Sequence, residues 1–196
     1  VELELVKVGS PDRIPFVSTG KIDIVMGAMT RNYKRQKIID YTLPVHTEVF
    51  GAVTTDKKPF NAVTDMNASD VNLAQVRGTM PADWAQKNLS NANITLFDNY
   101  PDALRSIAQG RNDAIVDVVD FLGEVMNTHK NVNWQVVEKA IDTWYCGIGI
   151  AKGNSTLQQW LNVAIYTMHK GGYVDDTWIK WFGIAQVHSV QPSPYF

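Results

Sequence analysis

Residues 21–35 have the sequence KIDIVMGAMTRNYKR, and this stretch decides the fold. Residues 21–29 form a nearly continuous apolar run, which is typical of a strand that is covered on both faces. The chain then turns polar, and the segment from Asn32 favours a short helix. Ligands of α/β proteins collect beyond the carboxyl ends of such strands, so this turn is a candidate binding site.

Thr30 and Arg35 could make this turn a site for an anion. The start of a helix presents backbone N–H groups that attract negative charge. Thr30 adds a hydroxyl, and Arg35 adds a planar guanidinium that can hold a carboxylate through two hydrogen bonds. The alternative is an ordinary strand-to-helix turn with a solvated surface arginine, and the residues taken alone favour that alternative.

Outward from this stretch, strand-like and helix-like segments alternate along the chain. We expect strands over residues 1–8, 21–29, 50–54, 71–76, 94–97, 113–118, 134–137 and 145–151. We expect helices over residues 12–19, 32–39, 82–89, 100–109, 120–129, 156–170 and 174–181, with an irregular tail from residue 185. This alternation predicts an α/β fold with largely parallel sheets.

Two further turns carry candidate groups. Gly78 and Thr79 lie between a predicted strand and a predicted helix, where Thr79 could cap the helix or help to hold an anion. Asp117 and Asp120 lie where the apolar run DAIVDVVD ends, and either acid could bind an ammonium group or cap the next helix.

Composition excludes several classes of function. The net charge is -2 and no basic block is present, so we expect no nucleic-acid partner. No apolar run approaches the roughly 18 residues that cross a bilayer. Cys146 is the only cysteine and fits a small buried apolar position, while the four histidines show no metal-ligand spacing. Phosphate-loop, dinucleotide and nucleophile motifs are absent, so we expect no metal, no cofactor and no catalytic residue.

Three aromatic residues of the last helix have the spacing of core positions, namely Trp178, Trp181 and Phe182.

The order of these segments resembles a known family. Residues 12–42, DRIPFVSTGKIDIVMGAMTRNYKRQKIIDYT, resemble the lobe-one core of the family 3 solute-binding proteins of polar amino-acid ABC transporters. The resemblance continues in VNLAQVRGTMPADWAQKNL (71–89), FDNYPDALRSIAQGRNDAIV (97–116) and YCGIGIAKGN (145–154). It ends with the closing helices IYTMHKGGYVDDTWIKWFG (165–183), so it covers nearly the whole chain.

This resemblance implies a type II periplasmic-binding-protein-like α/β fold of two lobes. Lobe one would comprise residues 1–47 and 151–196, and lobe two residues 48–150. The implied function is non-enzymatic: a small carboxylate-bearing ligand, foremost an amino acid, is captured in an interlobe cleft by hinge closure and delivered to an ABC transporter permease. The implied location is the periplasm or the extracellular face of the membrane.

The resemblance also implies roles for particular residues. The position of Arg35 holds the ligand α-carboxylate with help from Thr30, and the backbone at Ala28 contacts the α-amino group. In lobe two, Gly78, Thr79 and Met80 would add contacts to the same carboxylate. Arg13 lies where some binders of acidic amino acids place an arginine for a second carboxylate.

Three departures from the family pattern qualify this picture. The family's first strand and first helix are missing, so lobe one is expected to be incomplete at its N-terminus, and its open sheet edge could pair with a second copy of the chain. Met80 replaces the usual Thr or Ser. Val118 occupies the place of the acid that binds the ammonium group, which Asp117 or Asp120 could take over. Two alternatives stay open: a cyclohexadienyl-dehydratase-like enzyme and a truncated, non-binding interaction module.

Overall fold

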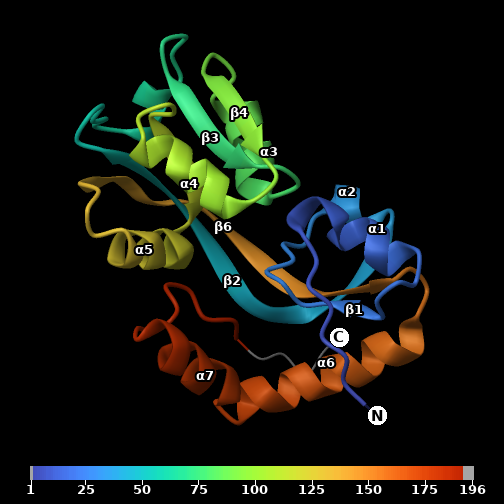
Figure 1. Ribbon diagram of the computed structural model, residues 1–196. Helices are drawn as coiled ribbons and strands as arrows, with labels where there is room; N and C mark the ends of the chain where they lie inside the picture. The colour runs from blue at the N-terminus through green and yellow to red at the C-terminus, as the bar shows by residue number, and fades with distance from the viewer. Residues whose placement is uncertain (1, 192–196) are drawn as a thin grey trace. The chain divides into compact units, whose positions relative to one another are not determined.

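The computed structural model describes residues 2–191, which form two compact units. Unit 1 consists of the described parts of residues 1–8, 12–48 and 144–196, and unit 2 of residues 9–11 and 49–143. Two neighbouring strands pass from one unit into the other, β2 (Ile39–Thr55) and β6 (Trp134–Ala151), as can be followed in Figure 1.

The remaining strands are short, and the helices range from 4 residues in α2 to 16 residues in α6. The strands are β1 (Ile24–Val25), β3 (Asn72–Val76), β4 (Asn93–Phe97) and β5 (Ala114–Val118). The helices are α1 (Arg13–Ser18), α2 (Tyr33–Gln36), α3 (Met80–Asn88), α4 (Tyr100–Ala108), α5 (Val119–Thr128), α6 (Ser155–Lys170) and α7 (Tyr173–Phe182). Short 3-10 helices cover Ser10–Asp12 and Val63–Met66.

The sheet order is β1-β6-β2-β5-β3-β4, and its strands run in both directions. Strand β3 is parallel to β4 and β5, and helices α3 and α4 supply the crossovers between these strands. In contrast, β2 is antiparallel to β5 and β1 is antiparallel to β6. The predicted α/β class is confirmed, but the expectation of largely parallel sheets was wrong, because β2 enters unit 2 directly from unit 1 and not through a crossover helix.

The core of unit 2 follows from the alternation of side chains along its strands. On β5, Ala114 and Val116 face one cluster, which includes Ala85 of α3. Ile115 faces the opposite cluster, which includes Ile107 of α4. Helices therefore cover both faces of this sheet, which explains why β5 is almost wholly apolar.

The core of unit 1 also has two parts. One cluster joins Val17 of α1 and Val25 of β1 to Ile39 of β2. The other joins Ile148 and Ile150 of β6 to Leu161 and Ile165 of α6. The first cluster also includes Met29, which follows β1. Apolar contacts with β2 therefore hold helix α1 and the segment after β1 in place.

Some predicted elements differ from the structure. Residues 2–8 form no strand, and Leu3 and Leu5 are 77% and 87% exposed, because no described strand pairs with this segment. The strand predicted over 21–29 is limited to β1, and the two strands predicted within 134–151 are one continuous strand. Trp181 and Phe182 are 76% and 43% exposed, so the core positions predicted for these two residues were wrong. The tail from 185 is irregular as far as the described residue 191.

Candidate functional site

The segment that follows β1 is held against strand β6. The amide of Arg31 donates to the carbonyl of Tyr145 at 2.8 Å, and the amide of Gly147 donates to the carbonyl of Met29 at 3.2 Å. Between these two bonds, Thr30 lies opposite Cys146 in an isolated antiparallel bridge. The backbone of Thr30 is therefore fixed by its neighbours on both sides.

Ala28 has a strained backbone. Its φ angle is +46°, and among the described residues it is the only non-glycine residue with a positive φ. This conformation costs a residue with a side chain roughly 1–2 kcal/mol, and such strain collects at functional sites. The strain lies two residues before Thr30, at the turn that the sequence marked as a candidate site.

Thr30 makes several polar contacts and is only 2% exposed. Its hydroxyl donates to Oε2 of Glu48 at 2.6 Å. Its carbonyl accepts from Nη1 of Arg35 at 3.0 Å and from the hydroxyl of Tyr41 at 3.3 Å. The Thr30 hydroxyl, which the family resemblance assigns to a ligand carboxylate, is directed toward a buried acid in this structure.

Arg35 is positioned by its helix as well as by Thr30. The side chain of Asn32 caps helix α2 and accepts from the backbone amide of Arg35 at 2.9 Å. The guanidinium of Arg35 is half-buried. A second guanidinium, that of Arg13, lies close to Gly27. A Cβ atom added to Gly27 would be 3.5 Å from Nη2 of Arg13, which is an ordinary van der Waals distance. We call Arg13, Ala28, Thr30 and Arg35 the anchor.

Glu48 is a buried acid beside the anchor and is 5% exposed. Burial raises the pKa of its carboxyl. Hydrogen bonds from Thr30 and Cys146 oppose this shift, and so do the charges of Arg13 and Arg35. Sequence reasoning noted Glu48 only as an available carboxylate, because its partners lie far away along the chain. The sequence signal that could have pointed to Glu48 is its position directly before the apolar run that begins at Val49 in strand β2.

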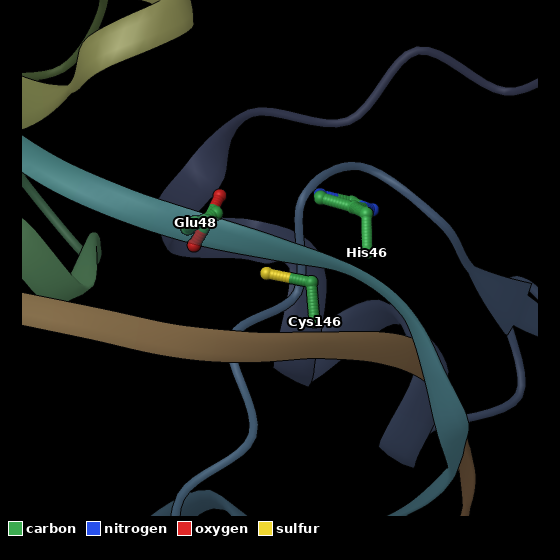
Figure 2. A group of neighbouring side chains, drawn as sticks. All are labelled: His46, Glu48 and Cys146. Atoms are coloured by element: carbon green, nitrogen blue, oxygen red, sulfur yellow. The ribbon is translucent and has the colours of Figure 1, made fainter. Parts of the chain in front are cut away.

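Two other side chains lie beside Glu48, as Figure 2 shows. His46 precedes Glu48 by two residues on β2, and Cys146 approaches from β6. One potential ligand atom from each residue lies within 4.8 Å of the others. Burial lowers the pKa of His46 to about 4, and its ring centroid lies 5.4 Å from that of Trp178. Burial, followed by the charge of Glu48, raises the pKa of the Cys146 thiol.

In unit 2, Thr79 caps helix α3. Its hydroxyl accepts from the amide of Ala82 at 3.3 Å and donates to the carbonyl of Val76 at 2.8 Å. Gly78 has a φ of +77°, and a Cβ there would lie 3.1–3.3 Å from the backbone of residues 10 and 11. Met80 is buried as the first residue of the helix. The capping role of Thr79 is thus confirmed, whereas a ligand contact by Gly78, Thr79 and Met80 stays a prediction.

The N-cap residue of helix α5 is Val118, whose side chain makes no capping bond. Asp117 is buried at the end of β5, where Oδ1 accepts from the amide of Val118 at 2.8 Å. Tyr100 donates to the same oxygen at 3.4 Å. Burial raises the pKa of Asp120, whose Oδ1 has no hydrogen-bond partner among the described residues. Neither acid is the N-cap residue, and the role of either acid toward an ammonium group stays a prediction.

Two α/β units that share two continuous strands define the class of two-lobed binding proteins. Within that class, the chain belongs to the bacterial extracellular solute-binding proteins, family 3, whose sequence profile matches residues 1–184. The predicted family and the type II fold are thereby confirmed. None of the described helices combines the length and apolar character that crossing a membrane requires.

Similar proteins bind amino acids. The chain is 26% identical over 176 residues to the ABC transporter glutamine-binding protein GlnH of Bacillus subtilis, covering 89% of this chain and 63% of that protein. It is 29% identical over 167 residues to the L-cystine-binding protein TcyJ of Escherichia coli K12, covering 83% and 61%. A solved structure of the ancestral amino acid-binding protein AncCDT-1, a precursor of cyclohexadienyl dehydratase, has a TM-score of 0.84 at 29% identity, covering 93% and 78%. The chain thus spans less than two thirds of the length of these two curated relatives.

Proposed function

We propose that this protein binds a small amino-acid-like solute through its α-carboxylate at the anchor of unit 1 and delivers it to an ABC transporter permease outside the cytoplasm. The observation that carries this proposal is the placement of Arg35. Its side chain is held by the carbonyl of Thr30 and its backbone by the cap at Asn32. A guanidinium that is fixed before the ligand arrives loses little freedom on binding.

Arg13 adds to the positive charge of the anchor and supports an anionic ligand. Both arginines interact electrostatically with Glu48, which accepts a hydrogen bond from Thr30, so both arginines lie near Thr30. One arginine suits the α-carboxylate, and a second would favour a ligand with another acceptor group. The names of the similar proteins, which include glutamine and cystine binders, agree with a polar amino acid.

Unit 2 would contribute through the start of helix α3 and through an acid at the end of β5. Thr79 and its neighbours Gly78 and Met80 are the groups we propose for the carboxylate. Asp117 is the group we propose for the ammonium. Substitution of Asp117 by Asn should weaken binding of an amino acid more than binding of its deaminated analogue, and equal losses would contradict this assignment.

The test of the proposal begins with the ligand itself. Mass spectrometry of small molecules that co-purify with the native protein identifies the solute, and calorimetry then compares Arg35→Ala with the unaltered protein. A charged hydrogen bond contributes about 1.5–3 kcal/mol, so Kd should rise about 10- to 150-fold. Lys34→Ala is the matched control, because Lys34 is exposed on the same helix. Unchanged affinity in Arg35→Ala, or an equal loss in Lys34→Ala, would overturn the proposal.

A second candidate function is favoured by Glu48. An enzyme that eliminates water and carboxylate from prephenate-like acids needs a general acid with a raised pKa, and Glu48 is a buried acid of that kind. The similar structure AncCDT-1 is described both as an amino acid-binding protein and as a precursor of cyclohexadienyl dehydratase, so it agrees with either function. Turnover of prephenate-like acids that is lost in Glu48→Gln would support the enzyme, whereas tight binding of an amino acid without turnover would support the binding protein. A protein that does neither would fit the interaction module.

A further inference from the structure

We propose that His46, Glu48 and Cys146 form a binding site for a divalent transition-metal ion, and that Zn²⁺ is the ion these three donors suit best. All three residues belong to unit 1. The proposal departs from the sequence-based expectation of no metal, which rested on the spacing of histidines along the chain.

The strands place the three donors on one side of the β2–β6 pair. Side chains two residues apart on a strand point to the same face, so His46 and Glu48 are neighbours by geometry. Cys146 lies on β6, and Figure 2 shows its sulfur directed toward Glu48. The potential ligand atoms lie at most 4.8 Å apart, whereas about 3.5 Å separates the ligands of a tetrahedral zinc ion. Side-chain rotations that close this gap by about 1 Å would complete the site.

The donor set matches the chemistry of zinc. Imidazole nitrogen, thiolate sulfur and carboxylate oxygen are the three protein ligands of Zn²⁺. The hard ions Ca²⁺ and Mg²⁺ prefer oxygen and would leave the sulfur and nitrogen unused. His46 offers a ring nitrogen as its ligand atom, beside one oxygen of Glu48 and the sulfur of Cys146.

The charges of the site also balance. Cys146 hydrogen-bonds to Glu48, and both groups are buried. Binding of Zn²⁺ would displace the thiol proton to solvent, and the resulting thiolate and the Glu48 carboxylate would together cancel the charge of the ion. The guanidinium of Arg35 favours the anionic form of both residues. Metal ligation needs the thiolate, so binding of the ion should release the thiol proton.

Cobalt(II) is the sharpest probe, since Cys146 is the only cysteine of the chain. A sulfur-to-cobalt charge-transfer band on addition of Co²⁺ to the unaltered, metal-free protein must therefore come from Cys146. We expect this band at one equivalent and its loss on addition of one equivalent of Zn²⁺. Bound Co²⁺ without a charge-transfer band, or no binding of either ion, would overturn the proposal.

A variant of His46 tests this residue as a second ligand, and a control variant excludes binding at the surface. His46→Gln should weaken Zn²⁺ binding roughly 10- to 100-fold or more, a range typical of groups that support a metal site. His188→Gln is the control, because His188 is an exposed histidine of the same unit. Equal affinity in His46→Gln and the unaltered protein would overturn the assignment. Because Zn²⁺ alone is the probe and no amino acid is added, the test does not require that the anchor binds an amino acid.

Discussion

Replacement of Thr30 by valine should destabilise unit 1, chiefly through the loss of the hydrogen bond to Glu48, and it also removes the long, weak hydrogen bond that the Cys146 thiol donates to the same hydroxyl at 3.9 Å. The Thr30 hydroxyl donates to Glu48 at 2.6 Å, and the two residues are 2% and 5% exposed, so water does not readily replace the donor. A hydrogen bond to a charged group contributes about 1.5–3 kcal/mol. For a chain of this size each kcal/mol corresponds to roughly 2–4 °C, so Tm should fall by about 3–12 °C at pH 8 in a thermal melt followed by circular dichroism.

The loss should depend on pH in a definite direction. The bond from Thr30 lowers the pKa of Glu48, which means that it stabilises the carboxylate more than the acid. Its contribution is therefore present at pH values above the pKa of folded Glu48 and declines as the pH falls through that pKa. Burial raises this pKa above 4.5, so the decline begins at a higher pH than for an exposed Glu.

Glu48→Gln is the control for this reasoning. Its side chain is neutral but can still accept a hydrogen bond, so Thr30→Val in that background should cost only about 0.5–1.5 kcal/mol at any pH. A loss below about 0.5 kcal/mol for Thr30→Val in the unaltered background at pH 8 would refute the argument. A loss of equal size at pH 4 and pH 8 would refute the part that rests on the charge of Glu48.

Two further predictions concern the backbone. Ala28→Gly should relieve the strain of a positive φ and raise the free energy of unfolding by up to about 1 kcal/mol, while Ala28→Val should lower Tm. A fall in Tm for the glycine variant would contradict the claim that the backbone of Ala28 is strained. Gly51→Ala should cost about 1–3 kcal/mol, because its Cβ would lie 2.7 Å from Cγ1 of Val119 and 2.8 Å from the carbonyl oxygen of Glu138. Gly123→Ala is the matched case, with nothing within 4 Å inside helix α5, and should instead gain roughly 0.5–1 kcal/mol in denaturant melts.

The fold could be predicted where a segment carries its own periodicity. Helices α4 and α6 and strands β3 and β5 follow the predicted ranges closely. The two strands are short runs that are mostly apolar, and the apolar residues of the two helices recur at helical spacing. Residues 2–8 show the limit of this approach. Their alternating pattern predicts a strand, but a strand also needs a pairing partner, and a pattern within one segment carries no information about that partner.

The candidate site could be predicted only in part, for a related physical reason. Arg35 and Thr30 follow a strand and lie close in sequence, so chemistry and resemblance both pointed to them. Glu48 and Cys146 became visible only in the structure, because 18 and 116 residues separate them from Thr30 along the chain. The hydroxyl of Thr30 was expected to face a ligand, but it has a buried acceptor that no local pattern indicates.

The acid beside the anchor connects the two proposals. With Glu48 ionised, its negative charge partly compensates the guanidinium groups of Arg13 and Arg35, so a ligand carboxylate must compete with it for the same positive charge. A divalent ion on Glu48 and the Cys146 thiolate would form a neutral group. That group would leave the arginines without their anionic partner and would strengthen their attraction for a carboxylate. Protonation of Glu48 acts in the same direction. Because coupling between two bound species is reciprocal, a carboxylate ligand should in turn favour the metal-bound or protonated form of Glu48.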